Sequence, residues 1–144
     1  MQDLSKPAKA PTTLASAGRH ALKTLLVDDD SFQIKLISSV LKSLGITDIT
    51  AAGSGAEALQ QISAQNRINL ILLDLHMPGM DGFQFMESLA KLGYSGALII
   101  VSGQSDSVLH SASLVAQLRR FTVLGTLAKP VERTALSALI AQLS

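Results

Sequence analysis

Short aliphatic runs recur along this chain, and each is followed by a stretch in which apolar residues return every three or four positions. Such runs predict buried strands, and the spaced stretches predict amphipathic helices. The unit repeats five times, which favours a parallel sheet with helices on both faces. The strands are expected at 22–27, 48–52, 70–73, 97–101 and 123–128. The fold class is therefore α/β, a doubly wound five-stranded parallel sheet.

Local signals mark where several helices begin and end. Asp30 or Ser31 is a suitable N-cap for the first helix, and Gly45 is a typical helix stop. Ser54 and Glu57 have the spacing of a capping box at the start of the second helix. The last two helices are expected at about 105–119 and 136–143.

The first 20 residues differ from the rest, because they are rich in Pro, Ala, Ser, Thr and Lys and show no apolar period. We predict a flexible tail over 1–20 and one domain over 21–144. The chain has 144 residues, of which 47% are hydrophobic, enough for one aliphatic core. Cysteine is absent, which excludes disulfides and thiolate metal sites.

Charge and hydropathy limit the partners. The net charge of +1 provides no strong field toward nucleic acid or an anionic membrane surface. No apolar run approaches the length of a membrane span, and the N-terminus lacks the apolar region of a signal peptide. We expect a cytoplasmic protein that binds neither nucleic acid nor membrane directly.

Polar side chains follow the predicted strands at their carboxyl ends. Asp28 and Asp29 follow the first strand, Asp74 the third, Ser102 the fourth and Lys129 the fifth. Ligands of open α/β sheets bind at these ends. If the first and third strands are neighbours, three carboxylates converge with one compensating lysine. Such a site favours a hard divalent cation, and Mg²⁺ best suits phosphate chemistry.

This set of groups is suited to phosphoryl transfer. A carboxylate can act as a nucleophile and form an aspartyl phosphate. The metal and the lysine would neutralise charge on the transferred group, and the Ser102 hydroxyl could then donate a hydrogen bond to it.

Four segments resemble, in order, the motifs of the response-regulator receiver family (CheY-like) of bacterial two-component systems. They are Leu26–Asp30, Leu73–Gly82, Val101–Gly103 and Leu127–Pro130. The resemblance extends from about 23 to 143. It implies a flavodoxin-like sheet with the strand order 2-1-3-4-5.

The resemblance also implies a role for each acidic residue. Asp74 would be the phosphorylated residue. Asp29 and Asp74 would ligate Mg²⁺ directly, together with the backbone carbonyl of His76, and Asp28 would assist through water. Asp81 is more readily a helix cap than a ligand.

By the same resemblance, Ser102 would be the switch hydroxyl, and Lys129 would pair with the phosphoryl group and precede a cis peptide bond to Pro130. His76 and Gln104 would tune the lifetime of the phosphorylated state. A histidine kinase or histidine phosphotransfer protein would donate the phosphoryl group. Output would be read on the surface of 105–119, 123–128 and the final helix.

The chain departs from the family pattern in two places. Thr126 stands where the family usually has a Tyr or Phe that rotates during switching. The segment between Ser102 and Lys129 is longer than usual. Together with Val123–Leu127, this spacing resembles receivers attached to EAL cyclic-di-GMP phosphodiesterase domains.

The resemblance implies a signalling switch with self-catalysed phosphotransfer and autodephosphorylation, rather than an enzyme with a separate substrate. Two alternatives stay open. A phosphatase of the haloacid-dehalogenase type would want a second Asp where His76 stands, and a degenerate receiver would serve only for docking. The sequence leaves open whether a homodimer forms, and whether the receiver stands alone or belongs to a longer chain.

Overall fold

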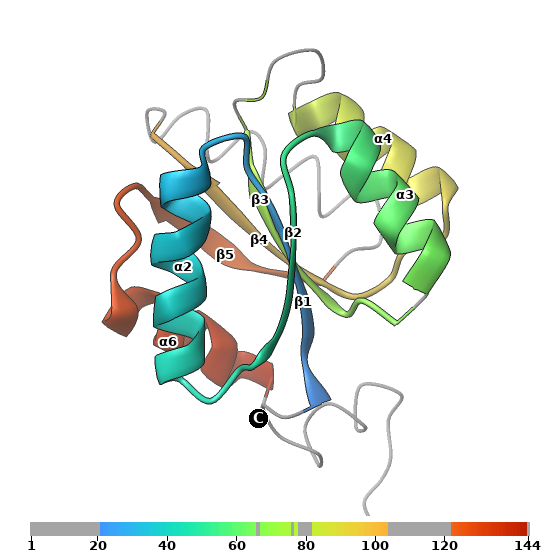
Figure 1. The fold of residues 1–144 in the computed structure, drawn as a ribbon. Coiled ribbons are helices and arrows are strands. Elements are labelled where there is room, and N and C mark those ends of the chain that lie inside the picture. Colours follow the sequence, from blue (N-terminus) through green and yellow to red (C-terminus); the bar gives the residue numbers. More distant parts are fainter. Residues whose placement is uncertain (1–20, 66, 76, 78–81, 104–121, 144) are drawn as a thin grey trace, which may run out of the picture.

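The computed structural model describes residues 21–65, 67–75, 77, 82–103 and 122–143. Within these ranges the strands form one parallel sheet in the order β2-β1-β3-β4-β5, as predicted (Figure 1). The strands are β1 (Lys23–Val27), β2 (Asp48–Ala52), β3 (Leu70–Asp74), β4 (Ala97–Ser102) and β5 (Thr122–Ala128). The helices are α2 (Ser31–Ser43), α3 (Gly55–Gln65), α4 (Gly82–Lys91), α6 (Arg133–Ile140) and the 3₁₀ helix η2 (Ala141–Leu143).

Every predicted strand is present within a residue or two of its expected bounds. The final helix begins earlier than expected and changes to 3₁₀ geometry at Ala141. The helix expected at 105–119 and the tail expected at 1–20 lie outside the described residues.

The capping signals are confirmed in atomic detail. The Asp30 side chain accepts hydrogen bonds from the backbone N–H of Phe32 at 2.9 Å and Gln33 at 3.4 Å, so Asp30 is the N-cap of α2. At the start of α3, the Glu57 N–H donates to Ser54 Oγ, and the Glu57 carboxylate accepts from the Gly53 N–H. These bonds satisfy backbone donors that a helix start leaves free.

Two apolar layers cover the two faces of the sheet (Figure 1). Helices α3 and α4 pack on one face, against residues such as Leu25 and Val27 of β1. Helices α2 and α6 pack on the other, against residues such as Leu26 of the same strand. Strands β3 and β4 are buried along their whole length. This explains their unbroken aliphatic sequence, because a strand covered on both faces has no solvent side.

Among the described residues, no helix is both long enough and apolar enough to cross a bilayer.

Candidate functional site

Three aspartates converge at the carboxyl ends of β1 and β3. These strands are neighbours, with Val27 paired to Leu73, so the residues that follow Val27 lie beside the end of β3. One carboxylate oxygen from each of Asp28, Asp29 and Asp74 lies within 4.8 Å of the others. Asp28 and Asp74 are each only 3% exposed, whereas Asp29 is exposed. The predicted acidic pocket is therefore present.

The backbone holds this pocket in place. The Asp28 N–H donates to the Ala52 carbonyl at 3.0 Å, which extends the pairing of β1 with β2 by one residue. The Asp30 N–H donates to Asp28 Oδ1 at 2.9 Å. On the other side, the Leu75 N–H donates to the Val101 carbonyl at 3.3 Å, immediately after Asp74. Sheet pairing thus continues to the residues that carry the carboxylates.

Lys129 reaches two of these carboxylates. Its Nζ lies 3.0 Å from Asp28 Oδ2 and 3.5 Å from Asp74 Oδ1. Burial lowers the pKa of Lys129, but the hydrogen bond to Asp28 and the charges of Asp74 and Asp28 outweigh it and raise the pKa above its ordinary value. Lys129 therefore stays charged at neutral pH. Its bond to Pro130 is cis, as the resemblance implied.

Ser102 lies on β4, the strand next to Asp74, and Thr126 lies on β5, one strand further along the sheet. Ser102 ends β4 and is fully buried, and its carbonyl accepts the N–H of Lys129 at 3.1 Å. Thr126 is half-buried in β5 and is paired with Ile100. The sheet thus places Ser102 and Lys129 side by side at the pocket. His76, Gln104 and Asp81, all singled out from the sequence, lie outside the described residues.

The pocket fits a hard divalent cation. Its ligand atoms are all carboxylate oxygens, which Mg²⁺ and Ca²⁺ prefer. Oxygens bound to one Mg²⁺ at about 2.1 Å are at most about 4.2 Å apart, close to the 4.8 Å limit found for the three aspartates. Three carboxylates facing one ammonium also leave a net negative charge. An ion with retained waters would offset this charge.

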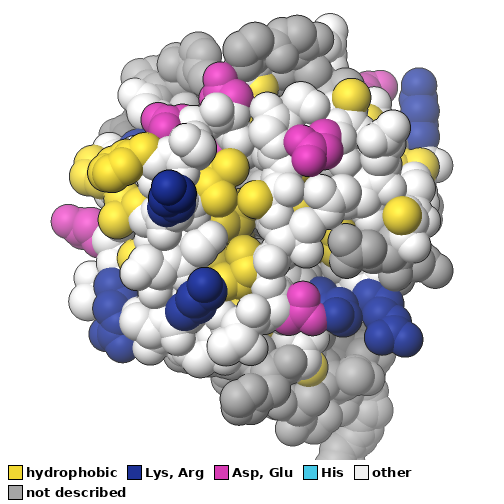
Figure 2. Space-filling view, viewed as in Figure 1, with side chains coloured by type: hydrophobic (Ala, Val, Ile, Leu, Met, Phe, Trp, Pro, Cys, Tyr) yellow, Lys and Arg dark blue, Asp and Glu magenta, His cyan; other side chains and the backbone are white. Residues whose placement is uncertain are grey.

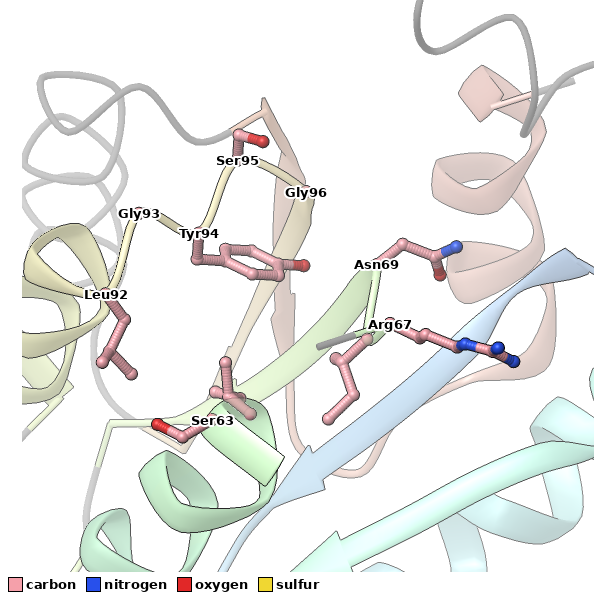
Figure 3. Close-up of a pocket in the computed structure, with 10 residues that line it drawn as sticks. Ser63, Arg67, Asn69, Leu92, Gly93, Tyr94, Ser95 and Gly96 are labelled. Carbon is pink, nitrogen blue, oxygen red and sulfur yellow. The ribbon is translucent and has the colours of Figure 1, made fainter. Parts of the chain in front are cut away.

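A second hollow lies at the opposite end of the sheet (Figure 3). It has a volume of about 580 Å³ and is lined by the segments that lead into β3 and β4, including Arg67, Asn69 and Tyr94. The Tyr94 hydroxyl donates to the Ala97 carbonyl at 2.7 Å. The Asn69 side chain accepts from the Lys23 N–H at 2.9 Å and donates to the Ala21 carbonyl at 3.1 Å. The polar side chains of Asn69 and Tyr94 are thus used in hydrogen bonds to the backbone and not directed at a ligand. The acidic pocket therefore remains the candidate site.

Comparison with known proteins assigns the chain to a family. The family model described as the response regulator receiver domain matches residues 24–141. The chain belongs to this family. It is thus a receiver domain of the two-component type, a family that acts as a phosphorylation switch and binds Mg²⁺ at an acidic pocket.

Two curated relatives and one solved structure illustrate the similarity. The chain is 29% identical to the transcriptional activator EvgA of Escherichia coli over 59% of its own length and 41% of that protein. It is 28% identical to the cyclic di-GMP phosphodiesterase RocR of Pseudomonas aeruginosa, over 83% of this chain and 30% of RocR. A response regulator from Colwellia psychrerythraea superposes with a TM-score of 0.71 at 28% identity, over 85% of this chain and 96% of that one. The chain therefore spans less than half the length of these two curated relatives.

The structure also reveals features that the sequence analysis missed. Phe32, in the first turn of α2, is 67% exposed although it is large and apolar. Apolar side chains gather on the α2 side of the molecule in Figure 2. The position of Phe32, two residues after Asp30, was a signal that could have been noticed. A second missed feature is the shift in the register of β5 against β4 between Leu98 and Ile99.

Proposed function

We propose that Asp74 accepts a phosphoryl group from a phosphohistidine of a partner protein, with Asp28 and Asp29 helping to hold Mg²⁺. The observation that carries this proposal is the place of the Asp74 carboxylate. It is almost fully buried, yet it lies 3.5 Å from the Lys129 ammonium and within 4.8 Å of two other carboxylates. A buried carboxylate clustered with other charges in this way is typical of functional sites.

The transfer itself is a displacement at phosphorus. An oxygen of Asp74 forms a bond to phosphorus while the bond to the donor's imidazole nitrogen breaks, and the leaving nitrogen keeps the electron pair. Mg²⁺, when bound, supplies positive charge to the phosphoryl oxygens. Lys129 supplies a second positive charge from the end of β5, and the Ser102 hydroxyl donates to the group once it is in place.

Differential contacts with the phosphoryl group would then shift the receiver between two conformations. Ser102 ends the strand next to β3, and Lys129 directly follows β5 with its ammonium 3.5 Å from Asp74, so both can sense the new charge. Thr126 replaces the usual aromatic residue, and we propose that switching proceeds without a rotating ring. Roles for His76 and Gln104 in setting the phosphoryl lifetime remain predictions, as does an output surface that includes β5 and α6.

The proposed partners are a histidine kinase or a histidine phosphotransfer protein, and the proposed compartment is the cytoplasm. An exposed apolar residue beside a buried nucleophile is a suitable contact for such a donor. Phe32 is exposed in the first turn of the helix that Asp30 caps, three residues after Asp29 of the acidic pocket. The likeness to RocR supports, as a further proposal, a receiver of the EAL-linked kind.

Phosphorylation by acetyl phosphate tests the central proposal. Intact-mass measurement should show one added phosphoryl group only when Mg²⁺ is present, and Asp74→Asn should abolish the addition completely. Continuous release of phosphate without an adduct would instead indicate a phosphatase. Absence of any adduct in the wild-type chain would indicate a docking module and refute the proposal.

Phe32→Ala tests the partner contact separately from the chemistry. Phosphotransfer from a phosphorylated histidine phosphotransfer protein should slow by about tenfold, because truncating a residue that anchors an interface costs more than about 1 kcal/mol. Acetyl phosphate makes no such contact, so its rate should stay unchanged. Equal slowing with both donors would show that Phe32 supports the fold and not the docking.

A further inference from the structure

Strand β5 contains one extra residue relative to its neighbour β4. Leu98 pairs with Val123, but the next residue, Ile99, pairs with Gly125. Leu124 therefore has no counterpart on β4 and forms a β-bulge. Gly125 suits this position, because its φ of +156° is rarely adopted by residues with a side chain.

The bulge changes the face of the sheet on which every later residue of β5 lies. Val123 packs against the apolar cluster under α3 and α4, and Leu124 against the cluster under α2 and α6. Without a bulge, strict alternation would direct Leu127 to the α3–α4 side. Leu127 instead belongs to the α2–α6 cluster. One extra residue has reversed the alternation, as a one-residue shift of register does.

Lys129 depends on this reversal. Pairing of β5 with β4 continues through Ala128, opposite Ser102, and then through the Lys129 N–H, which donates to the Ser102 carbonyl. The direction in which the lysine side chain leaves the sheet is set by the register established at Leu124. That direction brings its ammonium to Asp28 and Asp74.

Two side chains of the last helical segment hold the bulge. The Gln142 Nε2 of η2 donates to the Leu124 carbonyl at 2.8 Å. Leu139 of α6 packs directly over Gly125, where an added Cβ would lie 2.6 Å from Leu139 Cδ2. The bulge is thus held by a polar bond at one residue and by close packing at the next.

We propose that Gln142 is a positioning residue for Lys129: it stabilises the β5 bulge and thereby the register that delivers the lysine to the acidic pocket. The effect on phosphorylation rests on the proposed function, whereas the effect on β5 does not. Gln142 itself lies on η2, and its side chain donates a hydrogen bond to the bulge and not to the pocket.

Gln142→Glu is the main test, since it keeps the size of the side chain and removes the N–H donor. Amide hydrogen exchange of residues 125–129 should accelerate by about tenfold. The lost hydrogen bond stabilises the closed form of this segment by about a factor of ten in the equilibrium constant for local opening. Phosphorylation by acetyl phosphate should slow by about threefold or more, because the Lys129 ammonium stabilises the transferred phosphoryl group only when it is held close to that group. Gln142→Lys, which keeps a donor, should recover most of the rate.

The matched control is Gln61→Glu. Gln61 Nε2 donates to the Ala51 carbonyl at 3.1 Å, the same kind of bond on β2, at the other edge of the sheet. This variant should leave both the exchange of 125–129 and the phosphorylation rate unchanged.

If the two glutamate variants slow phosphorylation equally, or if exchange of 125–129 does not rise in Gln142→Glu, the positioning role is refuted. If the wild-type chain is not phosphorylated at all, the proposed function fails. The selective rise in exchange would then still establish that Gln142 stabilises the β5 bulge.

Discussion

The two ends of the sheet are built on opposite principles. At the carboxyl end, Asp28 and Asp74 are buried beside each other, and Lys129 supplies one positive charge to them. At the amino end, the Asn69 and Tyr94 side chains form hydrogen bonds with backbone groups of β1, of Ala21 just before it, and of β4. Together with Asp29, the three carboxylates of the carboxyl end exceed its one ammonium by two negative charges, whereas the side chains of Asn69 and Tyr94 are paired within the fold.

The difference teaches where stability and function reside in this receiver. Buried like charges destabilise a fold unless opposite charges or a bound cation compensate them. The carboxylates at the carboxyl end should therefore lower the free energy of unfolding relative to a neutral side chain at the same place. Hydrogen-bonded polar groups at the amino end stabilise the sheet and face no reactive group. Substitutions of polar residues at the carboxyl end should therefore raise the free energy of unfolding but impair phosphorylation. Substitutions at the amino end should lower the free energy of unfolding and leave phosphorylation unchanged.

Gly96→Ala should cause the largest change in stability. An added Cβ at Gly96 would lie 2.5 Å from Tyr94 Oη and 2.9 Å from the Asn69 carbonyl oxygen, neither of which can move freely. Overpacking of this kind costs about 1–3 kcal/mol, measurable by urea denaturation. Phosphorylation of the folded protein should be unchanged.

Gly53→Ala is the matched control for this prediction. The nearest atom to its added Cβ is Glu57 Oε1 at 3.8 Å, an ordinary contact. Its unfolding free energy should stay within about 0.5 kcal/mol of the wild-type value. A large loss of phosphorylation in Gly96→Ala would break the separation of the two ends.

Asp74→Asn should have the opposite effect on stability. In Mg²⁺-free buffer its unfolding free energy should rise by about 1–2 kcal/mol, because repulsion by two neighbouring carboxylates and the burial of a charge are removed. At ten times its Kd, Mg²⁺ should stabilise the wild-type chain by about 1.4 kcal/mol and the variant much less. Denaturation with and without Mg²⁺ measures both effects.

Asp48→Asn provides the comparison at the amino end. Asp48 is exposed and pairs with Lys23, so its neutralisation should lower stability slightly or leave it unchanged. A fall in stability for Asp74→Asn without Mg²⁺ would mean that its attraction to Lys129 outweighs the repulsion. The proposed contrast between the two ends would then be wrong.

The sequence was sufficient for most of the sheet because its signals are local. Aliphatic runs predicted each strand within a residue or two, and Asp30 and Glu57 cap helices as predicted. The strand order and the cis bond before Pro130 came from the family resemblance and are confirmed. Because parallel strands end at one edge, the convergence of the aspartates followed from the strand order.

The register of β5 could not be predicted in the same way. Gly125 inside an apolar run was a signal for a bulge, but the contacts that stabilise it come from Leu139 and Gln142, later in the chain. The sequence predicted Lys129 as the compensating charge among the carboxylates, but it did not show that the lysine lies closer to Asp28, at 3.0 Å, than to Asp74, at 3.5 Å. Contacts between segments depend on packing that composition and periodicity do not encode.

Tyr94→Phe should give the smallest change, and it has a distinctive pH dependence. At neutral pH, loss of the hydrogen bond to the Ala97 carbonyl should cost about 1 kcal/mol, measured by urea denaturation.

Burial raises the pKa of Tyr94 well above its ordinary value, so the folded state keeps the hydroxyl proton that the unfolded chain releases near pH about 10. The stability that depends on this proton is complete below that pH and decreases as the pH rises further. The wild-type chain should therefore lose stability more steeply than Tyr94→Phe between about pH 9 and 11, with no difference in phosphorylation at neutral pH. Parallel pH profiles for the two proteins would show that the Tyr94 hydroxyl is not sequestered from solvent.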